Sequence, residues 1–369
     1  MQFHRSRALA VWAACACLAS GAAFVGCEAI SNRLSKWKML DQKALEDPIR
    51  AVGGSAIVFS PAGEDHPLSR DRLAKATPLE LVAYYSPVLI QQRVNTAGQK
   101  HPYPPEYDLI GSAQLRRDSR GEFKATVGGA PAVYAIYQKL PIGAREHVQL
   151  TYTAWYPAHP RMKTFDVEAA DIDSCVLRLT LDEQNAPVLF ETIAACGCFH
   201  KAFVEKWVEE AAGHEFGMPE KGKKYAVERT VKDDIDWEVA GIVDEPREHP
   251  RRPVVFLKAG EHKVIGMGST SRLRVPAGAD VRNYSVVDYA ELYHVPVEGS
   301  NERAAFFDLD KGGKVRGAER KERFIFSLIG VDAAGQPRAN DQIKLHFDQS
   351  TWSDPTIYSR FLRLPRGAL

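Results

Sequence analysis

The chain has 369 residues, of which 45% are hydrophobic, 26% charged and 9% aromatic, and its mean hydropathy is −0.29. These values are ordinary for a globular protein that buries a core, and no low-complexity tract or long charged block indicates disorder. The formal net charge is +1, from 48 Lys and Arg against 47 Asp and Glu. A balance so close to neutral gives no electrostatic reason to expect a nucleic acid partner.

The first 26 residues have the form of a secretory signal peptide. Arg5 and Arg7 precede an uncharged stretch, 8–25, that is rich in Ala, Cys and Gly. A stretch of this length also fits a membrane-spanning helix. Its weak hydrophobicity per residue and its ending, Phe24-Val25-Gly26-Cys27, favour a cleaved leader instead.

That ending resembles the lipobox of bacterial lipoproteins. The resemblance implies that Cys27 is lipidated and becomes the new N-terminus, with Gly26 as the small residue before it and Phe24 in place of the usual leucine. In that family, Glu28 is compatible with the outer membrane. The resemblance therefore implies a lipid-anchored protein of the cell envelope, at the outer membrane or the periplasmic face, whose lipid binds the membrane. The alternative is a plain secretory leader in which Cys27 is incidental.

The mature chain begins with a polar tether and a well-marked helix start. Residues 27–50 are predicted to form the lipid-anchored tether, partly helical. Further on, Thr77 is a suitable N-cap, Pro78 suits the first turn, and Glu80 completes a capping box. Pro87 is expected to end that helix.

Strands are predicted to dominate the rest of the chain. Short runs rich in Val, Ile, Tyr and Thr alternate with turn signals, such as Asp118-Ser119-Arg120-Gly121. One helix is expected from Phe199, Phe203 and Trp207, which recur every four residues before Gly213. The predicted strands are 108–115, 122–127, 132–138, 147–156, 175–181, 188–193, 254–257, 324–329 and 343–347.

This pattern predicts a β-rich α+β fold, mainly an antiparallel β-sandwich with a few packed helices. Residues 51–369 are expected to form a single domain, with the loop-rich stretch 214–253 as a place where it could subdivide.

The most unusual local sequence is Cys196-Gly197-Cys198-Phe199-His200, placed between a predicted strand and the predicted helix. In an exported protein, a disulfide is the simplest interpretation, with Cys175 pairing with Cys196 or Cys198. Alternatively, these residues bind zinc or copper, with Cys175 or His147 completing the ligand set. A third alternative is a redox-active pair of thiols, and a fourth is inert buried thiols.

Two further groups of acidic residues are candidate cation sites. Asp308, Asp310 and Glu319 have the spacing of the first, third and twelfth positions of a calcium loop, although Gly312 and nearby basic residues favour a simple hairpin turn. Asp171 and Asp173, with His147 upstream, have the chemistry of a metal site or an acid–base pair. The alternative for this second group is a solvated loop that leads into a strand.

The segments around Cys196–His200 and 317–324 resemble those of uncharacterised bacterial exported proteins, which implies a folded family and no particular activity. The anchor and the absence of familiar catalytic motifs favour an envelope lipoprotein that is a non-catalytic ligand- or partner-binding module. The first alternative is a metal-dependent hydrolase built on His147, Asp171, Asp173 and the Cys196, Cys198 and His200 cluster. The second is a thiol redox protein.

Overall fold

The structure is a computed structural model that describes residues 55–63, 66–231, 237–271, 275, 278–329, 331, 333–345 and 350–369. The predicted signal peptide, Cys27 and the tether lie outside the described residues. The described residues belong to one compact unit. Within them, no helix has both the length and the apolar character that crossing a membrane requires.

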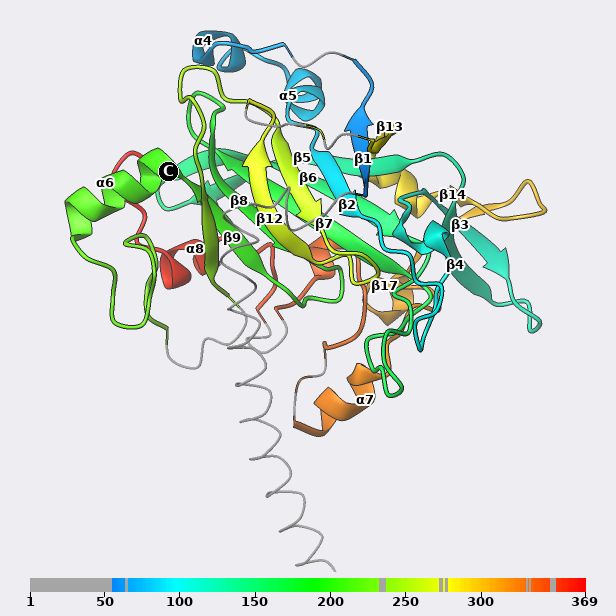
Figure 1. Cartoon of the computed structure of the whole chain (residues 1–369). Helices are drawn as coiled ribbons and strands as arrows, with labels where there is room; N and C mark the ends of the chain where they lie inside the picture. Colours follow the sequence, from blue (N-terminus) through cyan, green and yellow to red (C-terminus); the bar gives the residue numbers. More distant parts are fainter. Residues whose placement is uncertain are drawn as a thin grey trace, which may run out of the picture. The chain divides into compact units, whose positions relative to one another are not determined.

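Eleven strands form one large mixed sheet (Figure 1). They are β1 (Ala56–Pro61), β2 (Val88–Gln92), β5 (Ala132–Ile142), β6 (Arg145–Tyr156), β7 (Asp173–Leu181), β8 (Pro187–Ile193), β9 (Lys201–Glu205), β10 (Val239–Val243), β11 (Pro253–Leu257), β12 (Val264–Ser269) and β13 (Asp280–Asp288). Their order across the sheet is β10-β9-β8-β7-β6-β5-β13-β1-β2-β11-β12. The sheet curls until its edge strands β10 and β12 contact each other.

The structure confirms the β-rich expectation but does not confirm the antiparallel sandwich. Strands β5 to β9 form an antiparallel meander, with short connections except for the longer loop 157–172 between β6 and β7. The pairs β13–β5, β1–β13, β11–β2 and β10–β9 are parallel. Parallel pairing needs long connections, and the sequence pattern does not reveal which distant strands such connections bring together.

Shorter elements surround the sheet. Three small hairpins are β3 (Ser112–Arg117) with β4 (Phe123–Gly128), β14 (Val295–Pro296) with β15 (Arg303–Ala304), and β16 (Phe307–Asp308) with β17 (Lys314–Val315). The α-helices are α4 (Arg70–Leu73), α5 (Pro78–Tyr84), α6 (Lys206–Phe216), α7 (Glu322–Phe326) and α8 (Thr356–Phe361). The 3-10 turns are η1 (Pro105–Asp108), η2 (Tyr289–Tyr293), η3 (Leu309–Lys311), η4 (Ser327–Ile329) and η5 (Asn340–Gln342).

Local signals predicted some elements correctly and others wrongly. The capping box of Thr77 and Glu80 starts α5 as expected, and the turn at 118–121 joins β3 to β4. The predicted helix from Phe199 begins only at Lys206, because residues 201–205 form β9 with both faces buried. The run 324–329, predicted as a strand, is helical.

The core lies on both sides of the central strands. All nine residues of β7 are buried. Alternate residues of β6 and β7 join different clusters: Trp155 and Val176 pack in one, whereas Tyr156 and Leu177 pack in the other. A strand that is covered on both faces has no solvent side on which to place a charge. Any charged residue in these strands therefore needs a partner.

A close backbone approach at one end of the β3–β4 hairpin gives a stability prediction. A Cβ on Gly111 would lie 2.8 to 3.0 Å from backbone atoms of Gly128, whereas a Cβ on Gly128 would meet nothing within 4 Å. We therefore expect Gly111→Ala to lower the free energy of unfolding by about 1–3 kcal/mol, as overpacking does. Gly128→Ala is the matched control, and denaturant titration compares the two. Equal effects would contradict the proposed contact.

Candidate functional site

The centre of the candidate site is the buried carboxylate of Asp173, the first residue of β7. Its Oδ1 atom accepts hydrogen bonds from Arg320 Nη2 at 2.5 Å and from the backbone N–H of Ser174 at 2.9 Å. Burial alone would raise the pKa of Asp173, but the charges of Arg320 and His159 outweigh burial and hold that pKa well below its ordinary value. The carboxylate is therefore ionised although it is out of contact with water.

Two histidines approach the other oxygen of Asp173. The Nδ1 atoms of His159 and His262 each lie 2.9 Å from Asp173 Oδ2. Nε2 of His262 lies 3.4 Å from Asp108 Oδ1, and its ring stacks on Tyr156 with centroids 3.8 Å apart. The carboxylates of Asp108 and Asp173 overcome the effect of burial and raise the pKa of His262.

Loops from distant parts of the chain bring these groups together at one end of the central strands. Tyr156 ends β6 directly opposite Asp173 in the strand register, and His159 follows just after it. His262 lies in the turn between β11 and β12. Arg320 comes from the segment between β17 and α7. The site is therefore a product of tertiary structure, and no local motif defines it.

A shell of further charges covers the histidines. Lys263 Nζ lies 3.2 Å from Glu168 Oε2 and 3.0 Å from Glu261 Oε2. Burial opposes ionisation of Glu261, but Lys263 and Lys258 outweigh it and lower its pKa to about 2. Lys263 Nζ also lies 4.0 Å from the ring centroid of Phe199. A small cavity at this point is lined by residues that include Asp173, His262, Lys263 and Phe199.

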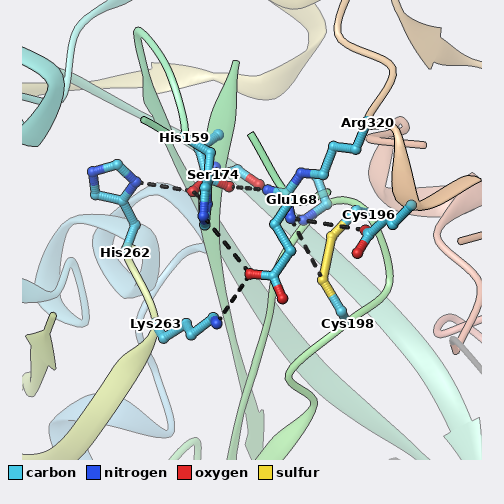
Figure 2. The surroundings of a disulfide bond; sticks show 11 residues. His159, Glu168, Ser174, Cys196, Cys198, His262, Lys263 and Arg320 are labelled. Carbon is cyan, nitrogen blue, oxygen red and sulfur yellow. Dashed lines mark hydrogen bonds and ion pairs between the residues drawn. A yellow bond between two sulfur atoms is a disulfide. The ribbon is translucent and has the colours of Figure 1, made fainter. Parts of the chain in front are cut away.

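Cys196 and Cys198 form a disulfide beside the guanidinium of Arg320 (Figure 2). The expected pairing with Cys175 does not occur, because Cys175 is a buried free cysteine. The two sulfurs belong to a tight turn that follows β8, closed by backbone hydrogen bonds from Gly197 to Ala194 and from Ala194 to Cys198. Nη1 of Arg320 lies 3.9 Å from Cys198 Sγ.

Glu322 completes this side of the site. Potential ligand atoms of Cys196, Cys198 and Glu322 all lie within 4.8 Å of one another, a grouping found among the described residues. Glu322 Oε1 is 4.0 Å from Arg320 Nη1 and accepts no hydrogen bond from the described protein atoms. Burial raises the pKa of Glu322 to about 7, against the lowering effect of Arg320.

Two residues in this region have left-handed backbone conformations that bulky side chains rarely adopt. Phe199 has φ of 62° and His262 has φ of 50°. The remaining described non-glycine residue of this kind, Asn185, lies in the β7–β8 turn, where asparagine is common. A non-glycine residue in the left-handed conformation lowers the free energy of unfolding by about 1–2 kcal/mol. Such strain gathers at functional sites, where the surrounding structure compensates it.

A second buried polar cluster lies deeper in the fold and has a different character. Glu191 Oε2 accepts hydrogen bonds from Arg178 Nε at 2.9 Å and from Tyr358 at 2.8 Å. His200 Nε2 lies 3.0 Å from Glu191 Oε1. Burial lowers the pKa of His200 more than Glu191 raises it. This cluster ties α8 to the sheet, and it holds His200 at Glu191.

The structure brings together only part of the predicted metal set. Cys196 and Cys198 are adjacent, but His200 is bonded to Glu191. His147 lies on β6, nine residues before Tyr156, the residue opposite Asp173. At the rise of a β-strand, nine residues span roughly 30 Å. The ring of His147 contacts the Leu181 carbonyl instead. Asp171 is exposed and precedes β7, so it does not share a strand face with Asp173.

Of the predicted calcium residues, Asp308 and Asp310 lie in the β16–β17 hairpin and Glu319 follows it, and cations of the chain pair with Asp308 and Glu319. Asp308 Oδ2 is 3.2 Å from Lys311 Nζ and 3.8 Å from Arg316 Nη1. Glu319 pairs with Arg323 and, at 3.5 Å, with Lys314. Asp310 lies in η3. The hairpin-turn alternative accounts for these residues.

A separate surface groove of about 370 Å³ lies beside α4 and α5. Its lining combines apolar side chains with polar and charged ones of both signs, and Arg72 pairs with Glu80 at 2.9 Å. The lining residues are Ala62, His66, Leu68, Arg72, Ala76, Glu80, Ala83, Tyr84 and Arg252.

Sequence reasoning did not find most of the residues around Asp173. No motif or spacing in the sequence assigns His262, Arg320 or Glu322 to Asp173. Arg320 is 147 residues from its partner Asp173, so no spacing rule connects them. No protein family, curated protein or solved structure matches the chain. The geometry therefore provides the functional evidence.

Asp173 and Asp171 form a natural pair for a stability test. We expect Asp173→Asn to lower the free energy of unfolding by about 3–5 kcal/mol, because it leaves Arg320 buried without its counterion. Asp171→Asn changes an exposed residue and should stay within about 0.5 kcal/mol. Urea denaturation measures both variants, and comparable losses would show that Asp173 is not the centre of the network.

The same two variants test how much Asp173 contributes to the pH dependence of folding stability. The pKa of Asp173 is lower in the folded than in the unfolded protein, so its carboxylate stabilises the fold above the ordinary value of about 3.9. That contribution is lost as the pH falls toward the folded-state pKa. The acid-side loss of stability should therefore be shallower in Asp173→Asn than in Asp171→Asn.

Proposed function

We propose that the protein is a lipid-anchored module of the cell envelope that takes part in thiol–disulfide exchange through Cys196 and Cys198. The observation that supports this proposal best is the disulfide's position beside the Arg320 guanidinium, 3.9 Å from Cys198 Sγ. A nearby cation stabilises the thiolate that must form whenever a disulfide is reduced. Cys198 is therefore the better leaving group of the two sulfurs.

The exchange needs a partner with two thiols, either one dithiol in a small molecule or an envelope protein, or two molecules of a monothiol such as glutathione. A thiolate of that partner attacks Cys196 Sγ, the Cys196–Cys198 bond breaks, and Cys198 leaves with the electron pair. The partner's second thiolate then attacks the mixed disulfide and releases Cys196. The partner is oxidised to a disulfide, and the Cys196–Cys198 pair is reduced.

Access to the sulfurs requires the turn at 194–199 to open, because Cys196 is only 3% exposed and Cys198 5% exposed. Phe199, which is half-buried next to this turn, has the strained φ of 62°. Opening relieves that strain, so it lowers the free-energy cost of exposing the sulfurs. Cys175 offers a contrast within the same chain, because burial raises the pKa of its thiol to about 12 and keeps it protonated.

The exchange can be followed on one tryptic peptide. Residues 179–201 contain both cysteines and no internal Lys or Arg. In glutathione buffers of graded potential, we expect the folded full-length chain to gain and lose two alkylatable thiols on this peptide reversibly. Cys175→Ser should behave like the parent, and Cys198→Ser should abolish the reversible two-thiol response.

A disulfide that becomes reducible only when the protein unfolds would refute this function. Circular dichroism of the same samples distinguishes the two cases, because the fold must persist while the peptide changes its redox state. If the pair is reduced only when the protein unfolds, the Cys196–Cys198 disulfide is a structural bridge.

The anchor is a separate part of the proposal and has its own test. We expect the parent chain to incorporate a fatty acid label and to fractionate with membranes, as the lipobox-like ending at Cys27 implies. Cys27→Ser should lose the label and remain unprocessed. Unchanged labelling of that variant would exclude Cys27 as the lipidated residue.

A non-catalytic binding module is the second candidate function, and the groove beside α4 and α5 supports it. The two candidates differ in what they require of the disulfide. A Cys196→Ser/Cys198→Ser double variant that folds and keeps its physiological activity would favour binding over exchange.

A further inference from the structure

We propose that the reduced form of the site binds a zinc ion through Cys196, Cys198 and Glu322. This inference rests on the proposed function, because it needs the two cysteines as thiolates. It adds a ligand to that function and makes metal binding depend on the redox state of the pair.

The geometry already places three ligand atoms around one point. Both sulfurs and a carboxylate oxygen of Glu322 lie within 4.8 Å of one another. Zn–S distances of about 2.3 Å and Zn–O distances of about 2.1 Å put neighbouring ligands of a tetrahedral site within about 4 Å. After reduction, the sulfurs therefore need to separate only to ordinary non-bonded contact.

Glu322 carries an independent sign of a missing partner. Its side chain is only 4% exposed, yet Oε1 accepts no hydrogen bond from the described protein atoms. A buried carboxylate oxygen in that condition is costly and is ordinarily hydrogen-bonded or bound to a metal. The Nη1 atom of Arg320 is 4.0 Å away, and that guanidinium is already bonded to Asp173 through Nη2.

Charge also favours a divalent ion here. Two thiolates and one carboxylate bring three negative charges into a buried place, of which Zn²⁺ neutralises two, while Arg320, which is shared with Asp173, offsets part of the third. Thiolate and carboxylate are both established zinc ligands, and three protein ligands leave a fourth position for water or a substrate atom. His200 is not part of the set, since Glu191 holds it elsewhere.

Oxidation would release the ion. When a disulfide such as oxidised glutathione accepts two electrons, the two thiolates become the Cys196–Cys198 bond and the oxidant becomes two thiols. The zinc then keeps only Glu322 and dissociates. The site would thus hold zinc under reducing conditions and lose it under oxidising ones.

The test loads the full-length chain with Zn²⁺ or Co²⁺ before and after reduction and removes unbound metal under nitrogen. We expect one metal ion per reduced chain above the background of the Cys196→Ser/Cys198→Ser double variant, and none per oxidised chain. Cobalt should add a thiolate charge-transfer band in the near ultraviolet. Glu322→Gln should weaken binding at least tenfold, whereas His200→Gln should bind like the parent.

The outcomes separate this inference from the function beneath it. Reversible reduction of the 179–201 peptide without metal uptake overturns the zinc site and leaves the exchange function standing. Equal metal affinity in Glu322→Gln and the parent also overturns the site as assigned. A pair that cannot be reduced in the folded chain overturns both proposals.

Discussion

The ion pair between Arg320 and Asp173 is the interaction on which the rest of the candidate site depends. Asp173 opens a strand whose nine residues are all buried, so its charge has no access to water. An isolated buried carboxylate would cost so much that it would become protonated instead. Arg320 and the two histidines keep it ionised, and in doing so they hold together three loops that no strand pairing joins.

Arg320 also links this charge network to sulfur chemistry. One nitrogen of its guanidinium bonds Asp173, and the other faces both Cys198 and Glu322. A cation that is fixed by a buried carboxylate cannot easily move away from the sulfurs. In the proposed exchange, this fixed cation would stabilise the negative charge that appears on reduction and lower the cost of forming a thiolate.

The sequence predicted what local physics decides and missed what distant contacts decide. The capping box at Thr77 was readable because its two hydrogen bonds lie within four residues, and most central strands were readable from their composition. The aromatic spacing of Phe199, Phe203 and Trp207 suggested a helix, yet 201–205 is a strand because the sheet buries both of its faces. His262 and Arg320 could not be assigned to Asp173, since their separations of 89 and 147 residues follow from the parallel topology and the loops.

The two buried polar clusters differ in the backbone conformation of their residues. Arg178, Glu191 and Tyr358 connect a helix to the sheet, and no residue among them has a left-handed backbone. The cluster around Asp173 contains His262 at φ of 50°, adjoins Phe199 at φ of 62°, and leaves a carboxylate oxygen of Glu322 without a hydrogen bond. His200, which Glu191 holds, also has a ring nitrogen without a hydrogen bond, so the left-handed backbones are what set the Asp173 cluster apart. In the proposed exchange and zinc binding, that strain would lower the cost of opening, and the unsatisfied oxygen of Glu322 would provide a ligand atom.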